Sequence, residues 1–179
     1  MSDTSQKQLP LRRLARKYAL QMIYQLDLAQ QPFSPEALLL FWPQAEEMHQ
    51  DLGEKEWAKI RPQVETFARG VTSRREAIDL IIEKFARNWS IERMAAVDRN
   101  ILRLAVFELY YCHDIPAAVS INEAIDLAKA FGSDESGRFV NGILDQIRLD
   151  QEKAAKGKAA KEKVVKHKGK QSGNTSNES

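Results

Sequence analysis

The segment from Val97 to Cys112 is apolar on nearly every side, and it constrains the fold of this 179-residue chain more than any other feature. Its apolar residues recur at helical spacing, and a helix that is apolar all round must be surrounded by other elements. We therefore place it at the centre of a bundle. No segment has the convincing alternation with a period of two that is typical of a strand. The sequence predicts an all-α fold.

Six further helices are predicted from three- and four-residue apolar spacing and from residues that favour helix ends. Proline favours a helix start, and we expect Pro62 to open the longest of the six. Ser120 and Glu123 form a capping box, and Gly132 is a stop signal. The helices are expected over residues 11–28, 36–42, 62–85, 90–94, 120–131 and 133–148.

The pair Asn141-Gly142 lies between apolar residues, which is a strong hairpin signal. A hairpin here would have strands of only about three residues, whereas the apolar residues from Phe139 to Ile147 keep helical spacing over three turns. We therefore assign the pair to a helix. Because glycine in a helix costs roughly 1 kcal/mol relative to alanine, we expect Gly142 to lie against a close neighbour. We expect Asn141 to hydrogen-bond a neighbouring backbone group.

Charge is distributed unevenly along the chain. The formal net charge is +2, but residues 151–179 contain eight lysines and three glutamates, so the rest of the chain is slightly negative. Any basic surface on the folded part is therefore a local patch. We expect a flexible arm over residues 1–10, a folded domain over 11–150, and a disordered Lys/Ala-rich tail over 151–179. A solubilising role for this tail is favoured over weak attraction to nucleic acid.

Several functional classes lack their sequence signals. Cys112 is the single cysteine, which excludes an intramolecular disulfide and a cysteine-rich zinc site, and the three histidines are not at metal-ligand spacing. The sequence has no Gly-rich phosphate loop, dinucleotide fingerprint or nucleophilic Ser elbow. It also has no membrane-spanning run or signal-peptide pattern. We expect a cytoplasmic protein that is not an enzyme and needs no metal or cofactor.

Two groups of residues could bind RNA. The first half of the 11–28 helix carries a basic face opposite its apolar side, and such a face can neutralise phosphates, although a solvated helix face explains it equally well. Near the last helix, a guanidinium and a ring could contact phosphate and stack on a base, although spacing alone favours a core position for the ring. The first group is Arg12, Arg13, Arg16 and Lys17, and the second is Arg138 and Phe139.

Four segments occur in a characteristic order and spacing. They are Arg12–Tyr24 (RRLARKYALQMIY), Val97–Leu109 (VDRNILRLAVFEL), Ile121–Lys129 (INEAIDLAK) and Phe139–Asp145 (FVNGILD). Together they resemble the NusB family of bacterial transcription antitermination factors, over roughly residues 11–147. The segment between Pro32 and Pro62 matches the family poorly, and the tail after Asp150 has no counterpart in the family core.

The resemblance implies an all-α fold of two packed three-helix subdomains and a function without catalysis. NusB-like proteins pair with NusE, a protein of the small ribosomal subunit, and the heterodimer binds boxA RNA. The assembly acts in the RNA polymerase antitermination complex and supports ribosomal RNA transcription. For this chain the resemblance implies RNA binding by Arg12, Arg13, Arg16, Glu135, Arg138 and Phe139, and partner binding by Tyr24 and Asp98.

Other functions stay open at this point. NusB-like domains also occur fused to ribosomal RNA cytosine methyltransferases, so the chain could be a related RNA-binding accessory domain. A methyltransferase itself needs a cofactor-binding α/β domain, and we expect this chain to end too soon to hold one. The chain could instead be a purely protein-binding helical adaptor whose arginines are only solvated. Self-association as a homodimer is also open.

Overall fold

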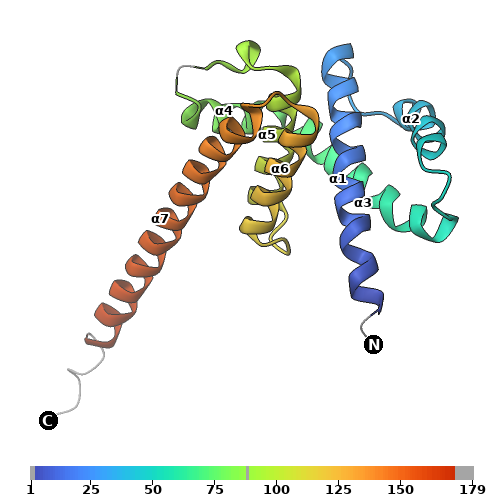
Figure 1. Ribbon diagram of the computed structural model, residues 1–179. Coiled ribbons are helices and arrows are strands. Elements are labelled where there is room, and N and C mark those ends of the chain that lie inside the picture. The colour runs from blue at the N-terminus through green and yellow to red at the C-terminus, as the bar shows by residue number, and fades with distance from the viewer. Residues whose placement is uncertain (1–2, 88, 172–179) are drawn as a thin grey trace, which may run out of the picture.

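The computed structural model describes residues 3–87 and 89–171, and all regular elements in these ranges are helices (Figure 1). The all-α prediction is therefore confirmed. The elements are α1 (Asp3–Ala29), α2 (Pro35–Met48), α3 (Glu54–Ser73), α4 (Arg75–Phe85), the 3-10 helix η1 (Ile91–Arg93), α5 (Ala96–Tyr111), α6 (Ala117–Phe131) and α7 (Ser136–Gln171).

The central element is α5, which packs against α1, α3, α4, α6 and α7. Every residue from Asn100 to Glu108 is buried. Helix α5 is therefore surrounded by other helices, as predicted from its apolar sequence. Apolar side chains on all sides of a helix can leave water only when neighbours cover each side.

The N-terminal helices α1, α2 and α3 form one packed group (Figure 1). The pairing of α1 with α3 is extensive, and α2 is attached through aromatic side chains. The Tyr18 hydroxyl donates to the Ala45 carbonyl at 3.0 Å, and the Tyr18 ring lies 5.5 Å from the Trp57 ring and 6.2 Å from the Phe41 ring. Burial raises the pKa of Tyr18 to about 12, so this hydroxyl stays a donor at neutral pH.

The remaining helices, α4 to α7, pack around α5. This second group therefore has four α-helices. One of them, α4, was expected to be part of a single helix over residues 62–85, and that prediction is wrong. The structure has α3 and α4 there, with Arg74 between them at φ −119° and ψ 15°. Nor does Pro62 open α3, which begins at Glu54. The Glu56 carboxylate accepts from the Gly53 backbone N–H at 3.1 Å, and this capping contact moves the helix start upstream.

Other helix boundaries also differ from their predictions. Helix α2 continues through Pro43 to Met48 instead of ending at residue 42, and the short helix after Ser90 is a single 3-10 turn. Helix α6 begins at Ala117, so Ser120 is not its cap. The Ser120 hydroxyl instead donates to the buried Glu108 carboxylate at 2.9 Å, and this tertiary contact overrides the local capping box.

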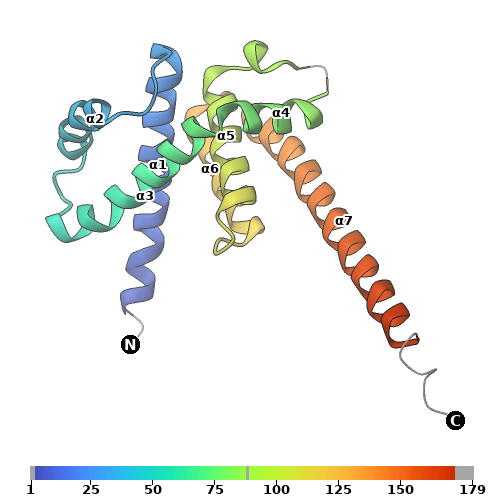
Figure 2. The same cartoon turned by 180° about the vertical axis from the view of Figure 1, so that it is seen from behind.

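Both terminal helices are longer than expected. Helix α1 already includes residues 3–10, and α7 continues to Gln171 and projects well beyond the other helices (Figure 2). Lys, Ala, Gln and Glu have high helix propensity, and the Arg148–Glu152 ion pair of 2.6 Å links successive turns where α7 leaves the bundle. The helical backbone of residues 3–10 and 151–171 differs from the flexible arm and disordered tail that we predicted. The division into domains at residues 10 and 150 stays a prediction.

The Asn141-Gly142 pair lies inside α7, so the prediction of helix at this point is confirmed. The predicted reason for the glycine is wrong, because a Cβ at Gly142 would meet no neighbouring atom within 4 Å. The Asn141 side chain forms no hydrogen bond with the described residues. The close approach occurs in α3 instead, where a Cβ at Gly70 would overlap the Phe107 ring of α5.

These two glycines predict stability changes of opposite sign. Gly142→Ala should raise the free energy of unfolding by up to about 1 kcal/mol, because alanine loses less backbone entropy and meets open space. Gly70→Ala should lower it by about 1–3 kcal/mol, because the Phe107 ring must shift. Urea unfolding followed by circular dichroism at 222 nm measures both changes, and equal values for the two variants would contradict this account of α3–α5 packing.

Candidate nucleic-acid interface

The predicted basic face of α1 is divided by the fold. Arg12 and Arg13 are exposed, Lys17 is half-buried, and Arg16 is only 5% exposed. A helical pattern places all four on one side of α1, but it does not show which of them meets a carboxylate on another helix.

Arg16 is held by a buried ion pair. Its Nε and Nη2 donate to the two carboxylate oxygens of Glu108 in α5 at 2.8 and 2.9 Å, and Ser120 of α6 donates to the same carboxylate at 2.9 Å. Burial disfavours the guanidinium charge, but the Glu108 carboxylate keeps the pKa of Arg16 above its ordinary value. Arg16 therefore joins α1 to α5 and α6, and it does not lie on the exposed face with Arg12 and Arg13.

A groove of about 660 Å³ lies between α1 and α6. On its α1 side, Arg13 donates through Nη2 to Glu123 and Asp126 at 3.0 Å each, and its side chain remains 61% exposed. On its α6 side, the Phe131 ring is 42% exposed and lies 6.0 Å from Lys17 Nζ. The groove thus brings together Arg13 and Lys17 of α1, Lys129 of α6 and an exposed ring. Sequence reasoning missed Phe131, although a large aromatic residue directly before the helix-ending Gly132 was a usable signal.

The residues predicted at the start of α7 lie on the surface. Arg138 pairs with Glu135 at 3.2 Å, and their side chains are 83% and 72% exposed. Phe139 is half-buried, and its ring meets the Trp89 ring edge to face with 5.9 Å between centroids. The fold therefore brings Glu135, Arg138 and Phe139 together with Trp89, which sequence reasoning did not single out.

The two predicted partner contacts have different environments. Tyr24 is half-buried in the second half of α1. Asp98, in the first turn of α5, is 8% exposed, and its Oδ1 has no hydrogen-bond partner among the described residues. A buried carboxylate oxygen without a donor is costly, so this atom is suited to accept a hydrogen bond from a binding partner.

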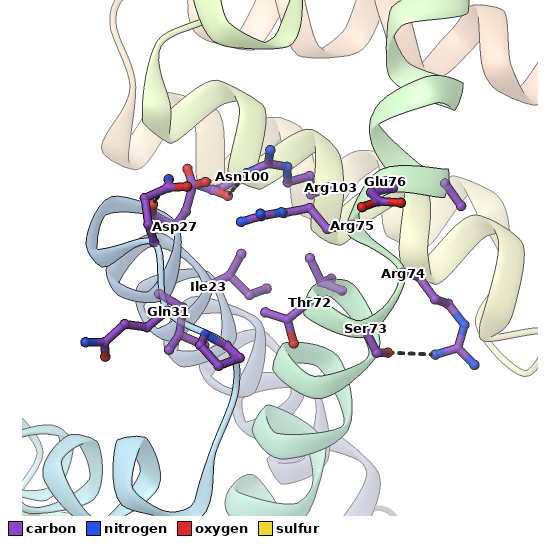
Figure 3. Close-up of a pocket in the computed structure, with 15 residues that line it drawn as sticks. Ile23, Asp27, Gln31, Thr72, Ser73, Arg74, Arg75, Glu76, Asn100 and Arg103 are labelled. Carbon is purple, nitrogen blue, oxygen red and sulfur yellow. Dashed lines mark hydrogen bonds and ion pairs between the residues drawn. The ribbon is translucent and has the colours of Figure 1, made fainter.

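A second hollow, of about 610 Å³, lies where α1, α3, α4 and α5 meet. Figure 3 shows Asp27, Asn100 and Arg103 on one side of it and Ser73 and Arg74 on the other. Arg103 bridges two carboxylates, since its Nη1 lies 2.9 Å from Asp27 and its Nε donates to Asp79 of α4 at 2.7 Å. The polar residues inside the otherwise apolar α5 segment were the sequence signal for this network.

Asp27 is the centre of that network. It accepts from Asn100 at 2.9 Å and from Arg99 Nε at 2.8 Å. Burial disfavours its charged form, but hydrogen bonds from Asn100, Arg99 and Arg103 hold the pKa of Asp27 below its ordinary value. Asp27 is therefore ionised at neutral pH and fixes the end of α1 to the start of α5.

The remaining ionisable and apolar groups do not add a further type of site within the described residues. In residues 3–87 and 89–171, no three His, Cys, Asp or Glu side chains are grouped so that they could hold a metal ion. No helix in the same ranges combines the length and apolar character needed to cross a membrane. Burial raises the pKa of the Cys112 thiol to about 11, so the thiol is protonated at neutral pH.

Comparison with known proteins gives a family match. Residues 13–148 match the model described as the NusB family. "Transcription antitermination protein NusB" of Myxococcus xanthus (strain DK1622) is 45% identical over 146 residues, which cover 79% of this chain and 97% of the relative. The protein of the same name from Anaeromyxobacter sp. (strain Fw109-5) is 46% identical over 133 residues, covering 74% and 86%.

Solved structures show the same fold. T. maritima NusB has a TM-score of 0.62 at 34% identity, covering 76% of this chain and 89% of that one. A chain in the crystal structure of antitermination factors NusB and NusE in complex with double-stranded RNA has a TM-score of 0.61 at 28% identity, covering 77% of this chain and 96% of that one.

The buried ion pair of Arg16 predicts a large loss of stability on truncation. Arg16→Ala should lower the free energy of unfolding by about 3–5 kcal/mol, because the Glu108 carboxylate would stay buried without its cation. Arg12→Ala, at an exposed position of the same helix, should change it by less than about 0.5 kcal/mol. Urea unfolding measures both variants. If Arg16→Ala is as stable as Arg12→Ala, the pair does not hold α1 on α5.

Replacing both partners tests the same point from the other direction. Arg16→Met combined with Glu108→Leu leaves no unpaired buried charge, so it should recover much of the stability lost in Arg16→Ala.

Proposed function

Since the chain belongs to the NusB family, we propose that it is a transcription antitermination factor that binds boxA RNA together with NusE. It works within the RNA polymerase antitermination complex in the cytoplasm and supports ribosomal RNA transcription. It acts by binding, without catalysis. Support comes from the family match over residues 13–148, from the names of the relatives, and from the similar fold of a NusB bound to NusE and RNA.

The α1–α6 groove is the observation that carries the RNA part of this proposal. Arg13 in the groove, and Arg12, which precedes it on α1 and lines a separate hollow beside α3, present two exposed guanidinium groups. The neutralisation of each phosphate releases counterions and adds affinity. Arg13 is paired with two carboxylates, of which Asp126 is half exposed and Glu123 is only 15% exposed. Exposed ion pairs contribute little, so phosphate oxygens can replace Asp126 at modest cost.

The start of α7 extends this RNA surface. Arg138 is exposed for phosphate contact, and the partly exposed Phe139 ring can stack on an unpaired base. Glu135 pairs with Arg138 at 3.2 Å on the same exposed surface. Arg16 contributes indirectly, because its pair with Glu108 holds the helix that presents Arg12 and Arg13.

NusE binds near the C-terminal end of α1, through Tyr24 of α1 and Asp98 in the first turn of α5. The unpaired and nearly buried Oδ1 of Asp98 carries this part of the proposal, because a donor from NusE would satisfy it. The heterodimer joins two modest RNA surfaces, so each protein alone binds RNA weakly. In the absence of NusE, association of two copies of the chain as a homodimer stays a prediction.

Removing the exposed arginines tests the RNA site. Arg12→Ala combined with Arg13→Ala should weaken boxA RNA binding in the presence of NusE by on the order of tenfold. The slope of log affinity against log salt should fall by about 1.4, because two contacts to single-stranded RNA are lost. Filter binding over a salt series measures both quantities.

The matched control is Lys55→Ala combined with Lys59→Ala, which removes two exposed cations from α3. It should leave the salt slope unchanged. If the arginine variant retains the slope and affinity of the unmodified protein, the α1–α6 groove is not the RNA site. If the unmodified protein with NusE does not bind boxA RNA, the protein-binding adaptor is the better description.

Charge reversal at the partner surface tests the NusE site. Asp98→Lys should abolish co-elution with NusE in gel filtration, because it replaces a buried acceptor with a cation. Glu47→Lys, which reverses an exposed charge on α2, should co-elute normally. Because Asp98 is buried, circular dichroism must show native helicity in each variant, and Tyr24→Ala provides a second test. Unchanged co-elution of both Asp98→Lys and Tyr24→Ala would refute the proposed interface.

A further inference from the structure

We propose that Trp89 is a base-stacking residue of the RNA surface, where it forms one platform with Phe139, Arg93 and Arg138. This inference rests on the proposed RNA-binding function and adds a second contact for an unpaired base. The platform connects two segments that are far apart in sequence, the link between α4 and α5 and the first turn of α7.

The Trp89 ring is anchored but not covered. It meets the half-buried Phe139 ring edge to face, at an interplanar angle of 72° and a centroid distance of 5.9 Å. Its backbone N–H donates to the Ala86 carbonyl at 3.0 Å, which fixes the main chain. Even so, 47% of the residue remains exposed. A large aromatic ring that is held from one side and open on another can accept a base without reorganisation.

One cation lies near the Trp89 ring, and a second is the chain neighbour of Phe139, against which the ring packs. The guanidinium carbon of Arg93 is 6.0 Å from the Trp89 ring centroid, and the Arg138 side chain, directly before Phe139, is 83% exposed. A base that stacks on Trp89 therefore places its own phosphate near positive charge. Aromatic rings combined with arginines are the usual means of holding single-stranded nucleic acid, because every base has a π face and every nucleotide has a phosphate.

Outside the α1–α6 groove, where Phe131 lies beside Lys17, the other exposed apolar side chains do not have this combination. Leu39, Leu40 and Leu80 are aliphatic and offer no π face. Tyr111 also lies beside an arginine, but it is stacked on Phe107 and has the Arg74 guanidinium 4.8 Å from its centroid, so less of its ring is open to a base. Tyr111 is therefore a matched control, since it is 41% exposed and has similar chemistry at another place.

Trp89 can be observed directly. The chain has three tryptophans, and the other two, Trp42 and Trp57, lie in the N-terminal group of helices. With Trp42→Phe and Trp57→Phe in place, and native helicity checked by circular dichroism, Trp89 is the single tryptophan of the chain. Titration of this variant and NusE with boxA RNA should quench its emission, measured against NusE and RNA alone, and filter binding should give the same midpoint.

Substitution measures the contribution of stacking. Trp89→Leu keeps an apolar contact with Phe139 but removes the π face, so it should weaken boxA RNA binding with NusE by on the order of tenfold. Trp89→Phe should retain most of the affinity, and Tyr111→Leu should leave it unchanged. Because stacking carries no charge, Trp89→Leu should not alter the salt slope, in contrast to the double variant of Arg12 and Arg13.

The outcomes separate this inference from the function on which it rests. Suppose that the Arg12 and Arg13 variant weakens binding, that Trp89→Leu binds like the unmodified protein, and that the variant with Trp89 as its single tryptophan shows no quenching. Stacking is then overturned and the RNA function stands. If Trp89→Leu weakens NusE binding equally in the absence of RNA, the surface is a protein interface and stacking is overturned. If the unmodified protein with NusE does not bind boxA RNA, both proposals are overturned.

Discussion

The arrangement of the helices depends on charged side chains buried in α5. Glu108 binds Arg16 of α1 and Ser120 of α6, while Arg103 binds Asp27 of α1 and Asp79 of α4. Burial of charge in an apolar helix is costly, and it is tolerated only where every partner is in place, because removal of one partner leaves an unpaired charge. Apolar packing brings α1 and α5 together, and these pairs select one position of α1 along α5 among those that apolar packing alone would allow.

That position determines which residues of α1 face outward. Arg16 meets the end of α5, whereas Asp27 meets Arg99 and Arg103 nearer its start, so the two helices run in opposite directions. The first half of α1 therefore lies along α6 and forms the groove that contains Arg13. Its second half, with Tyr24, lies toward the end of α5 that carries Asp98. The proposed RNA and NusE surfaces thus lie at opposite halves of α1, and the buried ion pairs of Arg16 and Asp27 fix the position of this helix.

The sequence predicts the parts of this structure that depend on local pattern. Helical spacing predicts the all-α fold and the central place of Val97–Cys112. A helix that is apolar on all sides must be buried, and this conclusion does not depend on which elements bury it. It does not predict that Arg16 is buried, because the partner Glu108 is 92 residues away and only the fold brings the two together. Helical spacing also misses the break between α3 and α4 at Arg74, because the apolar spacing continues through this residue. Trp89 escapes notice because its meaning depends on Phe139, which lies fifty residues further along the chain.

Arg13 and Arg16 show how burial separates structure from function within one helix. Both bind carboxylates at about 3 Å, but the Arg13 side chain is 61% exposed and that of Arg16 is 6% exposed. In water an ion pair contributes roughly 0–1 kcal/mol, so Arg13 can exchange its partners for phosphate, whereas Arg16 is almost fully buried with its carboxylate. An exchange of one partner for another yields little free energy per contact. The proposed RNA binding on this surface would therefore have to add several weak contacts from α1, α6 and α7, which fits the proposal that NusE extends the surface.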